Sequence, residues 1–197
     1  TFTIKDSAAY YTTGDFNISD NPNSVGTLNL QNSGLLSSAG TIFVGKGSGC
    51  SGTMNQTGGT TLAGSWVSVG RFYGATYGHG VGTLNLSAGL FQMTNATTAL
   101  IIGEDGNGTL NVSGTGVLIA TNEVRVGANS GSIGTVNLNG GLLATKRVYR
   151  PNLSASAYFN FNGGTLQASP GANANFLSGL DSASILSGGA IIDSGAN

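Results

Sequence analysis

A five-residue pattern, Gly-Thr-Leu-Asn-Leu, recurs along this chain and constrains its fold more than any other feature. It is clearest at Gly82–Leu86. Copies begin at positions 26, 52, 82, 108 and 134, and a degenerate copy begins at 157, which gives spacings of 26, 30, 26, 26 and 23 residues. Self-similarity at a period of this size is typical of a solenoid, in which each repeat packs on its neighbours.

Each repeat contains three short runs that favour β-structure. In the copy that begins at Gly108, residues 109–112 alternate polar and apolar, Val117–Ile119 is a second apolar run, and Val124–Val126 is a third. Alternation is the period of a half-buried strand, and no run has the period of a helix. The pattern predicts an all-β, right-handed parallel β-helix with about three short strands per coil of roughly 26 residues, and about seven to eight coils. We expect residues 1–197 to be a single β-helix segment of a longer repeat protein.

Alternation also predicts which side chains face outward. If Leu84 and Leu86 point into the core, Thr83 and Asn85 point out. Stacked coils then align these outward residues in two ladders, and we expect the amides to hydrogen-bond along the axis. The expected ladders are Thr1, Thr27, Thr53, Thr83, Thr109 and Thr135, and Thr3, Asn29, Asn55, Asn85, Asn111, Asn137 and Asn160.

The corners and the second run give two further expectations. Glycines beside each strand are expected to allow corners with positive φ. The second run of the coil that begins at Gly52 is interpreted as Thr61-Leu62, equivalent to Leu35-Leu36 and Leu90-Phe91 in the neighbouring coils. Arg150 falls where other coils have an inward valine, so we expect either a β-bulge there or a side chain that reaches the edge of the coil.

Composition excludes several classes of function. Charged residues make up 8% of the chain and the net charge is −1, so nothing indicates nucleic-acid binding. The lone Cys50 cannot form an internal disulfide or hold zinc by itself, and we expect it to be inert. No run reaches transmembrane length, so no membrane-spanning segment is predicted in this chain. Few cysteines and lysines with much Gly, Asn, Ser and Thr favour an extracellular or bacterial cell-surface protein.

The repeated Gly-Thr-Leu-Asn-Leu, followed by Gly-Gly-Leu, and the ending Ser187–Asp193 resemble the β-strand repeats of autotransporter-type passenger proteins and of bacterial cell-surface repeat proteins. The resemblance spans Thr27 to Asp193. It implies a right-handed β-helix, secretion, and a role as an adhesin stalk or surface coat. It brings no catalytic motif, and no cofactor is expected.

The strongest candidate for recognition is the extra sequence in the longest coil. The excess lies in residues 71–80, a glycine-rich loop with aromatic side chains that could stack on sugar rings or enter a partner. We expect Trp66 to pack near it. Folding back of these aromatics over the coil edge is favoured over a recognition role. The candidate residues are Arg71, Phe72, Tyr73, Tyr77 and His79.

Charged residues give weaker candidates. Glu104 and Asp105 share a turn that could hold calcium, although an ordinary turn is favoured because the ligands are too few. His79 has no Cys or Asp at ligand spacing, so no metal site is predicted. Glu123 and Arg147 are expected to form an ion pair between coils. Lys146, Arg147 and Arg150 form one basic cluster, for which a solvated edge is favoured over an anion site. Arg125 is expected to lie beneath Tyr149 in the stack.

These observations favour a non-enzymatic, extracellular structural or adhesive β-solenoid. Its expected partners are surface glycans or other copies of the chain, joined end to end where open coil edges meet. One alternative is a carbohydrate-binding or carbohydrate-cleaving β-helix, which requires a carboxylate cluster on one face. A second is an ice-binding face made by the Thr and Asn ladders.

Overall fold

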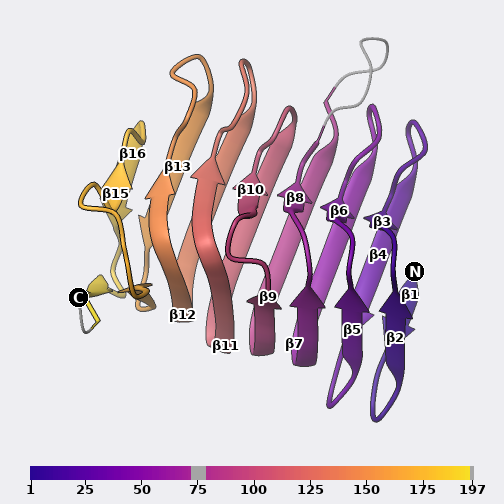
Figure 1. Ribbon diagram of the computed structural model, residues 1–197. Helices are drawn as coiled ribbons and strands as arrows, with labels where there is room; N and C mark the ends of the chain where they lie inside the picture. The colour runs from indigo at the N-terminus through magenta and orange to yellow at the C-terminus, as the bar shows by residue number, and fades with distance from the viewer. Residues whose placement is uncertain (72–78, 196–197) are drawn as a thin grey trace.

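The structure is a computed structural model that describes residues 1–71 and 79–195. All regular structure in these residues is β-strand, wound into a parallel solenoid of about seven turns. Figure 1 shows the coils side by side, with the two chain ends at opposite ends of the stack. The described part contains no helix long and apolar enough to cross a membrane. The right-handed winding stays a prediction.

The strands form three faces, which we number by their order along a coil. The first face contains β1 (Phe2–Ile4), β4 (Val25–Leu30), β13 (Ser156–Phe161) and β16 (Ser182–Ile185). The second contains β2 (Ala9–Thr12), β5 (Leu35–Ser38), β14 (Thr165–Ala168) and β17 (Ile191–Asp193). The third contains β3 (Phe16–Ile18), β6 (Ile42–Val44), β8 (Val67–Val69), β10 (Ala99–Ile102) and β15 (Leu177–Ser178).

In the central coils the strands continue around the corners. β7 (Ser51–Ala63) and β9 (Val81–Met93) join the first and second faces, whereas β11 (Asn107–Val126) and β12 (Ile133–Tyr149) run over all three. Small residues at the bends, such as Gly114 and Gly140–Gly141, let the backbone turn while the ladder shifts register. The prediction of three strand segments per coil is therefore confirmed, with neighbouring segments fused in the middle of the stack.

The pairing register between neighbouring coils follows the repeat in the sequence. Gly108 pairs with Gly134 and Asn111 with Asn137, and all the pairings among the described strands are parallel. The coil from Gly52 keeps this register against Gly82 although it is longer, because its extra residues lie between Arg71 and Val81, beyond the third face. The predicted position of the insertion is confirmed.

The core is one continuous column of apolar side chains inside the coils. Alternation along β9 and β11 buries Leu84, Leu86, Leu110 and Val112 while the threonines and asparagines between them stay half-exposed. Each buried aliphatic side chain contributes roughly 1.5–3 kcal/mol. Stability therefore grows with each coil added, as in other repeat proteins.

A buried polar pair lies among the apolar core residues, and it corrects the expected alignment of the second run. Leu36 pairs with Thr61, and Thr61 with Phe91, so the inward residue of this coil is Thr61 rather than Leu62. Thr61 is fully buried and donates a hydrogen bond to Gln56 Oε1 at 2.9 Å. Gln56 is also buried, in a position that Leu30 and Leu86 fill in adjacent coils.

Glycine serves two different purposes at the corners. Gly45 and Gly70, which directly follow β6 and β8, have φ of 75° and 74°, as expected for corners. The repeat glycine Gly82 does not have positive φ, and a Cβ there would lie 2.1 Å from the carbonyl oxygen of Val44. It is required for space, because the third strand of one coil and the first strand of the next approach closely at this point.

Candidate functional site

A groove of about 470 Å³ lies on the outer side of the third face, across β6, β8, β10 and the end of β11. It exists because outward residues of very different size are stacked there: Phe43 pairs with Ser68, Ser68 with Ile101, and Ile101 with Arg125. Ser68 and Ile101, which are shorter than the neighbouring Phe43 and Arg125 side chains, form a buried floor. The lining residues are Thr41, Phe43, Trp66, Ser68, Arg71, Ile101, Glu104, Arg125, Ala128, Asn129 and Pro151.

One carboxylate, that of Glu104, is held at the floor of the groove. Ser68 donates its hydroxyl proton to Glu104 Oε2 at 2.5 Å, and Arg71 Nε lies 3.6 Å from the same oxygen. The Glu104 side chain is mostly buried. A hydrogen bond of this length to a charged acceptor is a strong one, so it fixes the carboxylate in the groove.

Aromatic rings and guanidinium groups form the walls. The guanidinium carbon of Arg71 lies 5.0 Å from the Phe43 ring centroid, and that of Arg125 lies 5.1 Å from the Trp66 ring centroid. Arg125 also pairs with Glu123 at 2.6 Å. Each arginine at the groove therefore has a carboxylate partner, and the cations stabilise the aromatic walls through cation–π contacts.

The predicted recognition loop is placed only in part. Arg71 and Trp66 both line the groove, but the ring of Trp66 is stacked by Arg125, and the expected packing of Trp66 against the loop stays a prediction. His79 Nδ1 lies 2.7 Å from the main-chain oxygen of Asp105, on the next coil. The aromatic residues Phe72, Tyr73 and Tyr77 lie outside the described residues.

The turn considered for calcium does not gather its carboxylates. Glu104 points to Ser68 and Arg71, whereas Asp105 Oδ1 accepts a hydrogen bond from Asn129 Nδ2 at 2.6 Å. Within residues 1–71 and 79–195, no group of three or more His, Cys, Asp or Glu side chains is arranged to hold a metal ion.

Two expectations about the charged residues near the C-terminal end are wrong. Glu123 and Arg147 pair in register, but the carboxylate turns along its own strand to Arg125 and also accepts a hydrogen bond from the Tyr149 hydroxyl at 3.2 Å. Arg147 instead stacks on the Tyr149 ring, 3.8 Å from its centroid. The predicted basic cluster is the second wrong expectation, because its third cation, Arg150, pairs instead with Asp181 of the last coil.

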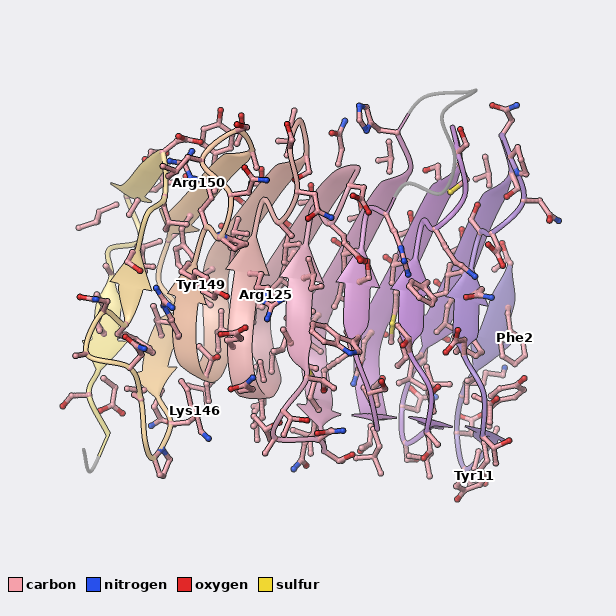
Figure 2. The ribbon with its side chains drawn as sticks, turned by 45° about the horizontal axis from the view of Figure 1, so that its top comes forward. Phe2, Tyr11, Arg125, Lys146, Tyr149 and Arg150 are labelled. Carbon is pink, nitrogen blue, oxygen red and sulfur yellow. The ribbon has the colours of Figure 1, made fainter. Side chains whose placement is uncertain are left out.

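Arg150 does behave as expected for a charged residue in an inward position. It follows the last residue of β12, and its side chain reaches the coil edge, where it pairs with Asp181 and donates to the Ala155 carbonyl at 3.0 Å. Arg125 and Tyr149 are register partners, as predicted. Figure 2 shows Arg125 and Tyr149 next to each other, with Arg150 toward the top of the view and Lys146 toward the bottom.

The asparagine ladder on the first face forms as predicted. Each amide from Asn55 to Asn160 donates to the one before it, at distances between 2.7 and 3.0 Å, and the chain of bonds ends at Asn29. The parallel threonine ladder, from Thr27 to Thr135, is in register beside it. Because the amides bond to each other, the ladder holds the coils together.

Cys50 is buried, with 1% of its surface exposed, and its thiol lies 3.5 Å from the Ser19 carbonyl oxygen. Burial raises the pKa of this thiol above its ordinary value. A protonated, enclosed thiol is a poor nucleophile.

Comparison with protein-family models, with characterised proteins and with solved structures gives no match to this chain. The fold and the groove together define a parallel β-solenoid with a mixed aromatic and charged groove on one face. The resemblance to autotransporter-type passenger repeats stays a prediction.

Sequence reasoning missed the groove. Its residues are scattered between positions 41 and 151, and none of them forms a local motif. A signal was nevertheless present in the third run, whose middle residues are Phe43, Ser68, Ile101 and Arg125. Aligning these in a column shows a small residue beside a large one, which is the condition for a depression in a stacked sheet.

Proposed function

We propose that this chain is a non-enzymatic structural or adhesive β-solenoid, a segment of an extracellular or bacterial cell-surface protein or fibre. The observation that carries the proposal is the unbroken asparagine ladder from Asn29 to Asn160. Continuous hydrogen bonding, with an apolar core that runs parallel to it, favours a stiff body whose length scales with the number of coils.

The charge distribution supports a role that does not involve acid–base chemistry. Glu104 and Glu123, the carboxylates at or beside the groove, are each paired with an arginine. Enzymatic glycoside cleavage by two carboxylates needs one of them free to carry a proton and the other free to attack or activate water. The few Cys and Lys residues beside abundant Gly, Asn, Ser and Thr support an extracellular setting.

End-to-end contact between copies is one way in which this proposal covers the outer coil edges, and flanking sequence of a longer protein is the other. The strands of the first and last described coils pair on one side only. Ile185, Ile191 and Ile192 are exposed at one end, and Phe2 and Tyr11 lie at the other, as Figure 2 shows for the latter two. Open edges of this kind favour pairing with another strand.

Two measurements test the proposal. The first is incubation with a panel of polysaccharides, followed by assays for reducing sugars and unsaturated products. We expect neither product to form, and turnover of any polymer overturns the non-enzymatic assignment. Electron microscopy of concentrated protein is expected to show end-to-end filaments. Particles that stay single at all concentrations would remove the end-to-end part of the proposal.

A further inference from the structure

The groove on the third face has the features of a built binding site rather than a gap between side chains. Its floor residues Ser68 and Ile101 belong to β8 and β10, which are paired with each other and with strands on both outer sides. The floor is therefore fixed by the backbone ladder. Its volume of about 470 Å³ lies within the usual range for small-molecule sites.

We propose that this groove binds a neutral saccharide. Glu104 and Arg71 would hydrogen-bond the hydroxyl groups of the sugar, and Trp66 would pack against the apolar side of its ring. This role goes beyond the structural function proposed above, and neither depends on the other.

The polar groups in the groove are positioned in advance and still have free capacity. Glu104 Oε2 is engaged by Ser68, whereas Oε1 has no hydrogen-bond partner among the described residues. Arg71 Nε is buried without a hydrogen-bond partner in the same part of the chain, since the 3.6 Å ion pair is too long to be one. A carboxylate acceptor beside guanidinium donors matches adjacent hydroxyl groups, each of which both donates and accepts.

The charge balance selects a neutral ligand. Arg71 is paired with Glu104, and Arg125 is paired with Glu123 beside the groove, so each guanidinium at the groove is balanced by an adjacent carboxylate. An acidic sugar would bring a second negative charge next to the Glu104 carboxylate, and a cationic ligand would meet the two arginines. A neutral molecule with several hydroxyl groups avoids both of these unfavourable charge interactions.

The position of the groove favours a saccharide over a peptide. One common mode of binding an extended peptide adds a strand to an open sheet edge, where the main chain supplies the hydrogen bonds. This groove lies over the middle of a sheet whose strands β8 and β10 already have partners on both sides. Recognition there must come from side chains, and the side chains present are aromatic, carboxylate, guanidinium and amide groups.

The chain carries its own reporter of occupancy, because Trp66 is its single tryptophan and lines the groove. The test is a fluorescence titration with neutral disaccharides (maltose, cellobiose and diacetylchitobiose) and with uronic-acid disaccharides as the acidic comparison. We expect saturable change in Trp66 emission with at least one neutral sugar, and an affinity that does not vary from low to high salt. Saturation-transfer NMR identifies the bound sugar independently of the tryptophan.

Two variants and one matched control locate the binding. Glu104→Gln keeps the size of the side chain and removes its charge, and Arg71→Gln removes the donors. Each is expected to weaken binding about tenfold, the effect of losing one hydrogen bond to a charged group. Lys146→Gln, a change of the same kind at a cation outside the groove, is expected to leave affinity unchanged. Thermal unfolding of all three verifies that they are folded.

Three results would overturn the inference. The first is that no neutral sugar in the panel changes Trp66 emission or gives saturation transfer. The second is tighter binding of the acidic disaccharides, with an affinity that falls as salt is added. The third is unchanged affinity in both Glu104→Gln and Arg71→Gln. None of these results bears on the structural role, which the ladder and the core support separately.

Discussion

The amide of Asn111 donates a hydrogen bond to Asn85 Oδ1 at 2.8 Å, although the two residues are 26 positions apart. The contact follows from the repeat, because one full turn of the solenoid places each asparagine over the equivalent asparagine of the preceding coil. The same amide group accepts from Asn137 at 2.7 Å, so an interior asparagine takes part in two bonds of the ladder. Asn29, at the end of the ladder, takes part in one.

Replacing an interior asparagine is therefore expected to be more harmful than replacing the terminal one. Asn111→Ala removes two hydrogen bonds and should lower the free energy of unfolding by about 1–2 kcal/mol, whereas Asn29→Ala removes one and should lower it by about half as much. Urea denaturation of the two variants measures the difference. Equal losses at both positions would show that the ladder does not act through its bonds.

The buried pair Gln56 and Thr61 gives a second prediction. Gln56→Leu leaves the Thr61 hydroxyl without its acceptor, and Thr61→Val leaves Gln56 Oε1 without its donor, so each should destabilise the chain by about 1–3 kcal/mol. The double variant leaves neither group of this pair unpartnered. It should be more stable than the sum of the single effects indicates, by at least about 1 kcal/mol.

The measurement is a double-mutant cycle in denaturant, with all four proteins compared at the same temperature. Gln56 Nε2 also donates to the carbonyls of Gly59 and Leu90, at 3.2 and 2.9 Å. Loss of those bonds is common to Gln56→Leu and the double variant, so it cancels in the coupling energy. Strict additivity of the two changes would contradict the prediction.

The repeated motif predicted the first face most reliably, because Gly-Thr-Leu-Asn-Leu combines a strand period with a coil period. It placed Leu84 inside and Asn85 on the ladder correctly. The second run of one coil was misaligned by one residue, since Thr60 and Thr61 carry no apolar signal and the buried polar pair became clear only from the structure. In a strand, such a shift exchanges inside for outside.

The ion pairs and the groove could not be predicted for a different reason. Register fixes which backbones are neighbours, and on that basis Glu123 was expected to meet Arg147. The Glu123 side chain turns to Arg125 instead, because Arg125 lies on the same face of the same strand and reaches the carboxylate at 2.6 Å. The groove likewise depends on the sizes of Ser68 and Trp66 relative to residues one and two coils away, which no local pattern expresses.

Glycine in the repeat should be irreplaceable where the coils approach. In Gly82→Ala the new Cβ would lie 2.1 Å from the Val44 oxygen and 2.3 Å from the Gly70 nitrogen, and both of these are backbone atoms. The backbone must shift to admit it, so a loss of about 3 kcal/mol or failure to fold is expected. Gly14→Ala is the matched control, because nothing lies within 4 Å of its Cβ position. Thermal unfolding of the two variants makes the comparison, and similar melting temperatures would contradict it.

The Cys50 thiol should be protected and should make stability depend on alkaline pH. Burial raises its pKa in the folded chain, so the folded state keeps a proton that the unfolded state loses. Stability is then expected to decrease as the pH rises through the ordinary thiol pKa, and Cys50→Ala should lack that part of the decrease. A thiol reagent should label Cys50 in the native protein only as fast as the fold opens and exposes the thiol. Immediate labelling of native protein would show that the thiol is accessible.

The stability of the last coil should decrease at acid pH because of the Asp181 carboxylate. The hydrogen bond from the Ala157 amide at 2.8 Å lowers the pKa of this carboxyl below its ordinary value, and Arg150 adds to the effect. A lowered folded-state pKa contributes stability that is present above the unfolded pKa and is lost as the pH falls through the folded one. NMR titration should find the Asp181 pKa low in the native chain. In Arg150→Gln it should rise while staying below the ordinary value, because the Ala157 bond remains. A native pKa at or above the ordinary value would show that neither contact holds the carboxylate.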